Sequence, residues 1–151
     1  MNLTRVDKVF WIMTMNTGEN LKPAYGQGDA SFQAAGGQQG LRCLVDAFYD
    51  QMEQLAEAKT IRDMHADDLS VSRDKLALFL CGWLGGPKLY REKYGAIGIP
   101  KAHQHLEIGL SERDAWLLCM EKAIALQSYA ADFKVYLLEQ LAVPAERSRT
   151  R

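Results

Sequence analysis

The most regular hydrophobic pattern of the chain lies between residues 41 and 55. Apolar residues recur there at three- and four-residue steps: Leu41, Leu44, Val45, Phe48, Met52 and Leu55. Such steps place side chains on one face of an α-helix, because a helical turn takes about 3.6 residues. The pattern therefore predicts a long amphipathic helix whose apolar stripe faces the protein core.

Similar periodicity predicts three more long helices. The first runs from about residue 70 to 84 and ends at Gly85-Gly86-Pro87, since two permissive residues and a proline without an amide donor stop a helix. The second opens at Ser111-Glu-Arg-Asp114, which resembles a capping box with Asp in the acidic position. The third runs from about 128 to 142 and ends at Pro144, and the polar residues after it are expected to fray.

The connections between these helices are rich in glycine and proline. Asp29 or Ser31 is expected to cap a short helix that ends at Gly36-Gly37, and residues 60–68 form a turn or a broken helix. Residues 88–109 are expected to be mostly loop with a turn or two of helix. No segment alternates apolar and polar positions long enough to predict a strand, so the expected fold class is all-α.

The beginning of the chain is separated from the rest by a linker. Leu3, Val6, Phe10 and Met13 predict a short amphipathic helix over residues 2–14. We therefore divide the chain into an N-terminal extension (1–27), a compact domain (28–143) and a polar tail (144–151). The apolar run at 9–15 is shorter than the roughly 20 residues that span a bilayer, and it lacks the features of a signal peptide. We expect a soluble, cytoplasmic protein without a membrane partner.

Composition narrows the class of protein. With 151 residues, 48% of them hydrophobic, and a formal net charge of −1, the chain suits one folded domain. It suits neither a disordered protein nor a dedicated nucleic-acid binder. Cys43, Cys81 and Cys119 are too far apart for a CxxC pair or a zinc ribbon and are expected to be reduced thiols. The function must therefore depend on a local site.

The three histidines are the first candidates for such a site: His65, His103 and His105. His65 stands close to Asp67 and Asp68, and a cluster of histidine and aspartate can ligate zinc. The spacing matches neither an HExxH helix nor a di-iron bundle. Local chemistry therefore leaves open a zinc site made by His65, Asp67, His103 and His105, or ordinary solvated histidines.

A set of short motifs occurs in a consistent order along the chain. They are Ala35-Gly36-Gly37, Phe48-Tyr49, Asp67-Asp68-Leu69, Phe79-Leu80, Leu84-Gly85-Gly86-Pro87 with Tyr90, His103, and Glu112-Arg113-Asp114-Ala115-Trp116. In this order, with thirteen positions from His103 to Trp116, the motifs resemble group II of the truncated haemoglobins over about residues 25–128. The resemblance implies a two-over-two globin fold with a long loop before His103, to which this chain adds an N-terminal helix.

The resemblance also implies a haem-binding site. His103 is then the proximal ligand of a haem b iron, neutral and with its second ring nitrogen in a hydrogen bond. The residues expected around the porphyrin are apolar or aromatic: Phe48, Leu76, Phe79, Leu80, Tyr90, Leu106 and Ile108. Lys75 is expected to pair with a haem propionate. Many relatives have arginine before the proximal histidine, where this chain has Ala102, and His105 is expected to be a solvated neighbour.

On the distal side, the resemblance implies Tyr49, His65 and Trp116. The hydroxyl of Tyr49 and the indole of Trp116 are hydrogen-bond donors, and such donors stabilise the partial negative charge of an oxygen ligand in a dry cavity. The position of His65 requires a length difference in its loop, so Met64 is a rival for it. Ser72 falls at the usual distal helix position and is small enough to leave an opening beside the haem.

By this resemblance the protein binds O2, NO and CO reversibly at a pentacoordinate iron, with high oxygen affinity. Slow oxygen release suits NO dioxygenation or a peroxidase-like reaction better than oxygen transport. We find no flavin or NAD motif, so electrons are expected from an unknown reductase, and the protein is expected to be a monomer or a homodimer. Two other hypotheses are a haem-free helical interaction or sensor module and the zinc site.

Overall fold

The computed structural model describes residues 24–151, so the helix expected over residues 2–14 lies outside the described part. The helices, in chain order, are α2 (Ala30–Ala34), α3 (Gly37–Gln54), η1 (Ala56–Ala58), α4 (Lys59–Asp63), α5 (Ser70–Trp83), α6 (Leu89–Tyr94), α7 (Ile99–His103), α8 (Leu110–Ala125) and α9 (Ala131–Arg147). Residues 24–151 contain no strand, in agreement with the all-α class. In the same range, no helix has the length and apolarity needed to cross a membrane.

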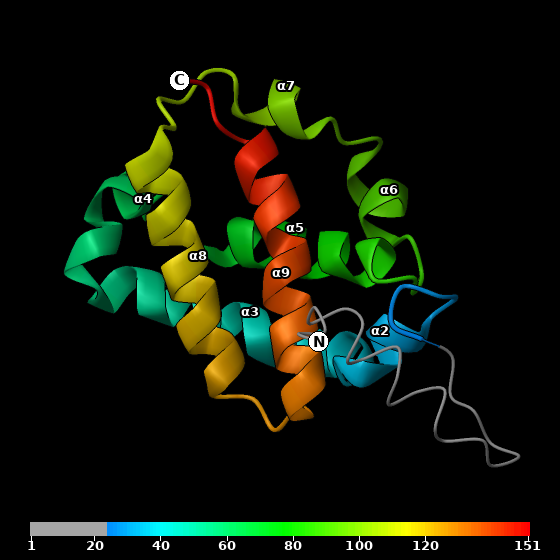
Figure 1. The fold of residues 1–151 in the computed structure, drawn as a ribbon. Helices are drawn as coiled ribbons and strands as arrows, with labels where there is room; N and C mark the ends of the chain where they lie inside the picture. Colours follow the sequence, from blue (N-terminus) through cyan, green and yellow to red (C-terminus); the bar gives the residue numbers. More distant parts are fainter. Residues whose placement is uncertain (1–23) are drawn as a thin grey trace, which may run out of the picture.

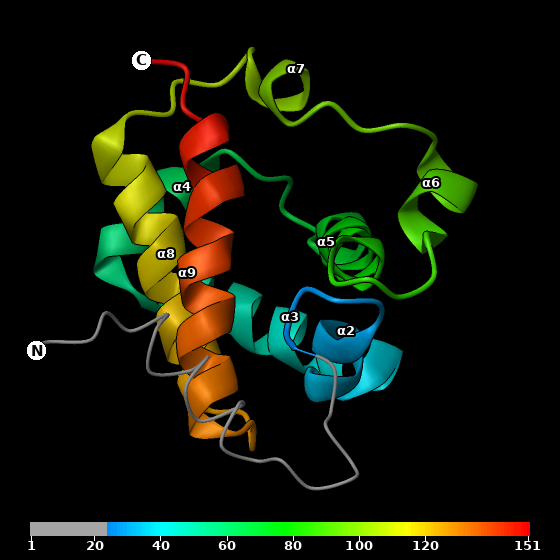
Figure 2. The ribbon, with the colours of Figure 1, turned by 45° about the vertical axis from the view of Figure 1, so that its right-hand side comes forward.

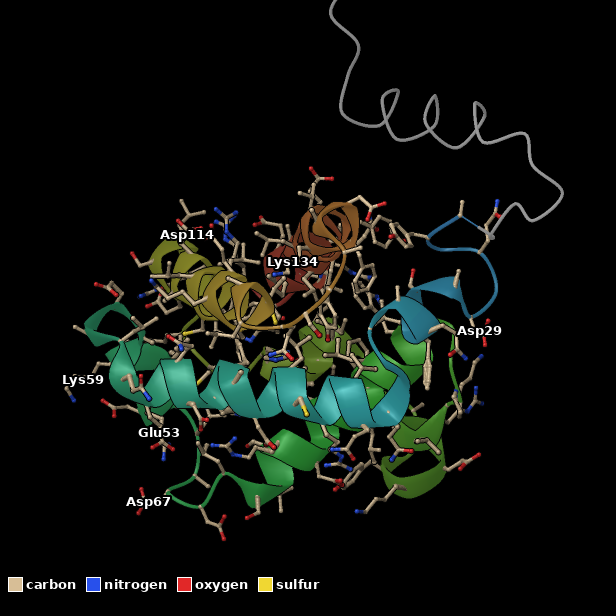
Figure 3. The ribbon with its side chains drawn as sticks, turned by 90° about the horizontal axis from the view of Figure 1, so that it is seen from below. Asp29, Glu53, Lys59, Asp67, Asp114 and Lys134 are labelled. Atoms are coloured by element: carbon tan, nitrogen blue, oxygen red, sulfur yellow. The ribbon has the colours of Figure 1, made fainter. Side chains whose placement is uncertain are left out.

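Two pairs of long helices form the body of the fold. Figure 1 and Figure 2 show α8 and α9 side by side and running in opposite directions, with α3 and α5 crossing them as the second pair. α3 contacts both α5 and α8 and lies between them, as Figure 3 shows from below. α6 and α7 lie on the long connection between α5 and α8. This is the two-over-two arrangement that the resemblance implied.

The apolar stripe of α3 is buried, as its spacing predicted. Its core residues are Leu41, Leu44, Val45, Phe48 and Met52. α8 and α9 bury apolar residues in the same core cluster, among them Cys119, Met120, Phe133 and Leu137. Removing this surface from water is the main force that holds the two helix pairs together.

The end of α5 comes very close to the backbone near α2. Gly85 has a φ of 92°, and a Cβ on it would lie 2.0 Å from the carbonyl oxygen of Gly28. A Cβ on Gly86 would lie 2.4 Å from the ring of Phe32. Since only glycine fits at both positions, the Gly85-Gly86-Pro87 motif both ends α5 and allows it to pack against α2.

α9 continues past Pro144, where the sequence pattern predicted its end. Proline removes one amide donor from a helix, and contacts made after it compensate for that loss. The amide and hydroxyl of Ser148 both donate to the carbonyl oxygen of Pro144, at 3.1 and 2.9 Å, and Arg113 of α8 bonds Glu146. The helix also begins later than predicted, at Ala131.

The residues after α9 are bonded to the rest of the fold, so the expectation of a frayed tail is wrong. The amides of Thr150 and Arg151 donate to the carbonyl oxygen of Ile108, at 2.8 and 3.2 Å. Residues of polar composition are therefore held here by backbone hydrogen bonds to a segment far away in the sequence.

The start of α8 also differs from the prediction. Gly109 is the N-cap residue, and its amide donates to Oε2 of Glu112 at 3.0 Å. The capping box is therefore formed by Gly109 and Glu112, two residues before the expected pair of Ser111 and Asp114, and the prediction is wrong in its register. Asp114 instead accepts hydrogen bonds from the guanidinium of Arg113, and Figure 3 shows it at the outer edge of the molecule.

One carboxylate links three helices. Asp74 of α5 accepts hydrogen bonds from Arg42 of α3 at 2.5 Å and from Lys93 and Tyr94 of α6 at 2.8 and 2.6 Å. These hydrogen bonds, that of Lys93 first, hold the pKa of Asp74 well below its usual range. They fix α6, which carries Tyr90, against the body of the fold.

Asp74→Asn is expected to lower the free energy of unfolding by about 1–3 kcal/mol at neutral pH, because it weakens charge-assisted hydrogen bonds. The folded-state pKa is depressed, so this stabilisation is present above the unfolded value of 3.8 and is lost as the pH falls below it. Urea unfolding at a series of pH values should show that the difference in the free energy of unfolding between wild type and variant becomes smaller at acidic pH.

Asp46→Asn is the control for this prediction, since the Asp46 carboxylate is 60% exposed beside Arg73. Its effect should stay below about 1 kcal/mol. Equal losses in the two variants would contradict a special role for Asp74.

Candidate functional site

A cavity of about 360 Å³ lies at the edge of the helix pairs, and α3 to α9 all contribute to its lining. Most of the lining side chains are apolar or aromatic. The polar groups are few: they include two imidazoles, a tyrosine hydroxyl, an indole and the charged side chains of Lys75, Glu112 and Arg113. An apolar cavity with a few polar groups is the usual form of a cofactor site.

The structure brings the predicted site residues together in this cavity. The predicted residues that line it are Tyr49, His65, Lys75, Leu76, Phe79, Leu80, Tyr90, His103, Leu106, Ile108 and Trp116. They come from α3, α5, α6, α7, α8 and the connections between them, and their meeting depends on the whole fold.

Phe48 lies behind this lining, fully buried in the core. Its ring centroid is 5.1 Å from that of Trp116 and 4.9 Å from that of Tyr49. Phe48 therefore supports two lining aromatic rings from the core side.

His103 ends α7 and lines the cavity. Its Nδ1 lies 2.7 Å from the carbonyl oxygen of Ile99, one turn earlier in the helix. A carbonyl only accepts hydrogen bonds, so in the neutral imidazole this contact places the proton on Nδ1 and the lone pair on Nε2. This is the tautomer that a histidine needs in order to bind a metal through Nε2.

His65 follows α4 and has the same type of backbone contact. Its Nδ1 lies 2.7 Å from the carbonyl oxygen of Ile61, and its ring centroid is 5.6 Å from that of Tyr49. Burial, more than any other cause, lowers the pKa of His65. Met64, the rival for this position, lines the cavity as well.

Tyr49 projects from α3 and is 5% exposed. Burial raises the pKa of Tyr49 to about 12, against a smaller opposite effect of Arg73. The hydroxyl therefore keeps its proton at neutral pH. It donates to the carbonyl oxygen of Ser72 at 3.4 Å, which is long for an O–H···O bond and correspondingly weak.

Two predicted residues have contacts that bear on their expected roles. The ammonium of Lys75 lies 5.2 Å from the ring centroid of Tyr94, and within residues 24–151 no carboxylate pairs with it. His105 is exposed and is not a lining residue, whereas Ala102 is. This placement agrees with the interpretation of His105 as a solvated neighbour.

Several lining residues were missed by the sequence analysis. They are Ile61, Ile97, Ile99, Glu112, Arg113, Leu141, Pro144, Ala145 and Ser148. Ile61 and Ile99 each stand four residues before a lining histidine, a spacing that the sequence shows. Ala145 and Ser148 were missed because the predicted helix stopped at Pro144.

The zinc hypothesis finds no support in the geometry. Among residues 24–151, which include all four proposed ligands, no group of three or more His, Cys, Asp or Glu side chains is placed to hold a metal ion.

Comparison with known proteins assigns the family. Residues 30–146 match the family model described as bacterial-like globin. Over 117 residues the chain is 31% identical to the group 2 truncated hemoglobin YjbI of Bacillus subtilis (strain 168), a match that covers 78% of this chain and 86% of that protein. The chain belongs to the group II truncated haemoglobins.

Solved structures of truncated haemoglobins share the fold of this one. The group II 2-on-2 hemoglobin from Agrobacterium tumefaciens matches with a TM-score of 0.75 and 32% identity, over 88% of this chain and 97% of that chain. The truncated oxygen-avid haemoglobin from Bacillus subtilis matches with a TM-score of 0.68 and 29% identity, over 79% of this chain and 98% of that chain.

Membership of this haemoglobin family implies a haem cofactor, and the residues present fit one. Haem is a largely apolar ring with an iron that accepts an imidazole nitrogen and with carboxylates at its edge. The cavity of this truncated haemoglobin offers an apolar lining, the Nε2 atom of His103 and the ammonium of Lys75. The donor set therefore matches the group in charge and polarity.

Proposed function

We propose that this protein holds haem b in the cavity through Nε2 of His103 and binds O2, NO or CO reversibly beside Tyr49, His65 and Trp116. Haem held by the imidazole of His103 would supply an iron that can bind a diatomic gas. The observation that carries the proposal is the contact of His103 Nδ1 with the Ile99 carbonyl, in a cavity that also contains the Tyr49 hydroxyl and the Trp116 indole as donors.

The chain's own residues then have separate tasks. The Ile99 carbonyl orients the imidazole of His103. Leu76, Phe79 and Leu80 form an apolar wall that excludes water. The hydroxyl of Tyr49 is free to leave its long contact with Ser72 and to donate to a gas ligand at little cost.

The Tyr49 hydroxyl and the Trp116 indole support a high oxygen affinity, because a polarised oxygen ligand gains more from such donors than carbon monoxide does. A relative from Bacillus subtilis is described as oxygen-avid. Slow oxygen release suits NO dioxygenation or peroxidase-like scavenging, with electrons from a separate reductase.

The proposal is tested by adding haem to the purified protein and recording its visible spectrum with and without CO. We expect one haem per chain and an intense Soret band that shifts on reduction and again with CO. A chain that stays colourless under these conditions would overturn the proposal and would favour a haem-free interaction module.

A further inference from the structure

The connection between α7 and α8, residues 104–109, is part of the cavity wall. Leu106 and Ile108 line the cavity, and the connection begins directly after His103. The amide of Leu106 donates back to the carbonyl oxygen of His103 at 2.9 Å. The position of the connection therefore bears directly on the position of the His103 imidazole.

The chain after α9 returns to this connection. We call residues 148–151 the strap. The hydroxyl of Thr150 accepts a hydrogen bond from the amide of Ile108 at 2.8 Å and donates one to the carbonyl oxygen of Leu106 at 2.5 Å. The carbonyl oxygen of Ile108 also accepts hydrogen bonds from the amides of Thr150 and Arg151, as described above. A hydroxyl is needed here because it donates and accepts at once.

A charged contact extends the strap to the start of α8. Nη2 of Arg151 lies 3.0 Å from Oε1 of Glu112, whose side chain is 8% exposed and lines the cavity. The other carboxylate oxygen of Glu112 accepts the amide of Gly109, where the connection ends. The strap thus holds the connection at its middle through Thr150 and at its end through Arg151.

The same part of the chain faces the cavity. Pro144, Ala145 and Ser148 line it from α9 and the strap. Figure 2 shows the last residues, in red, rising from α9 towards the connection beside α7. One short stretch of chain therefore contributes lining residues and fixes the wall next to His103.

We infer that the strap positions the proximal wall, so that Thr150 and Arg151 keep the His103 imidazole aligned and slow the loss of haem. This inference rests on the haem-binding function proposed above. Thr150 and Arg151 are positioning residues: they act through the connection and do not line the cavity themselves.

Three full-length variants test the inference. Thr150→Val keeps the shape of the side chain and removes the hydroxyl, Thr150→Ser keeps the hydroxyl, and Arg151→Gln removes the charge that faces Glu112. Arg147→Gln is the matched control, because it removes an exposed positive charge near the end of α9 and outside the strap.

The first measurement needs no haem. Amide hydrogen exchange of the haem-free chain should be about tenfold faster at Ile108 in Thr150→Val than in wild type, since two hydrogen bonds of the hydroxyl are lost. Thr150→Ser should restore the wild-type rate. An unchanged exchange rate at Ile108 in Thr150→Val would overturn the inferred role of the strap, whether or not the protein binds haem.

The second measurement uses the haem-loaded protein. Transfer of haem to an acceptor globin should be about tenfold faster from Thr150→Val and faster from Arg151→Gln, but unchanged in Thr150→Ser and Arg147→Gln. The iron–histidine stretching band of the reduced protein should shift or broaden in Thr150→Val. It should stay at its wild-type position and width in Thr150→Ser. A general loss of stability would not produce this band shift.

These outcomes separate the two proposals. Faster exchange at Ile108 with unchanged haem loss and an unchanged iron–histidine band would overturn the positioning role and leave haem binding intact. A wild-type chain that takes up no haem would overturn the proposed function, and with it the inference.

Discussion

His103→Gly is expected to lose haem at least about 100-fold faster than the wild-type protein, since even the loss of a residue that orients a metal ligand costs about 10- to 100-fold. The variant removes the imidazole and leaves a space in the cavity that free imidazole can enter. Added imidazole should therefore restore the Soret band and the shift with CO. Haem transfer to an acceptor globin, with and without imidazole, measures both effects.

His105→Gly is the matched control for this experiment. His105 is two residues further along, is exposed and does not line the cavity. Its replacement should leave haem retention within about twofold of wild type, as is usual for a surface position. If His105→Gly lost haem as fast as His103→Gly, or if His103→Gly kept a normal spectrum, the proximal assignment would be wrong.

The hydrogen bond behind the ligand comes from the backbone of the same helix. The Ile99 carbonyl sets the tautomer of His103 through the backbone, so no substitution at Ile99 removes it. Pro100 is the second residue of the short helix that carries both residues, and its fixed φ suits the first helical turn. The sequence thus builds the ligand and its orienting group into a single helical turn.

The parts of the fold that could be predicted from the sequence are those encoded locally. The apolar stripe of α3 is confirmed because one face of a helix is read directly from three- and four-residue steps. The end of α5 is confirmed because two glycines and a proline act on their own backbone. The cavity residues came from the order of motifs, which the family resemblance linked to one site.

The parts that could not be predicted depend on distant contacts. Pro144 is a local stop signal, and α9 passes it because Ser148 and Glu146 are bonded beyond it. The register of the α8 cap depends on Glu112, which also bonds Arg151. Nothing in the local sequence of a polar tail indicates that it will bond a segment about forty residues away.

Phe48 shows a further limit of the sequence. Adjacent residues of a helix differ by about 100° in direction, so Phe48 and Tyr49 cannot both face one cavity equally. Their order in the sequence does not show which of them lines it. The rotation of α3 between α5 and α8 decides this, and it places Tyr49 in the lining and Phe48 behind it.

Tyr49→Phe is expected to speed oxygen dissociation about tenfold, since it removes one hydrogen-bond donor from the cavity and little volume. The rate should be measured by displacement of oxygen with CO in stopped flow. Because burial raises the pKa of Tyr49 to about 12, the hydroxyl keeps its proton over the working range. Titration of Tyr49 should therefore cause no change in the rate of oxygen dissociation from the wild-type protein between about pH 6 and pH 10.

The dissociation of CO is the internal control for Tyr49→Phe, because CO accepts hydrogen bonds weakly and should leave the variant at nearly the wild-type rate. Trp116→Phe removes the indole donor in the same way, and the double variant shows whether the two donors act on one ligand. Since both side chains line one cavity and pack on the same Phe48 ring, their effects should differ from simple addition. An unchanged rate of oxygen dissociation in Tyr49→Phe would show that Tyr49 does not donate to the gas ligand. Its hydroxyl would then serve only as the donor to the Ser72 carbonyl that the structure shows.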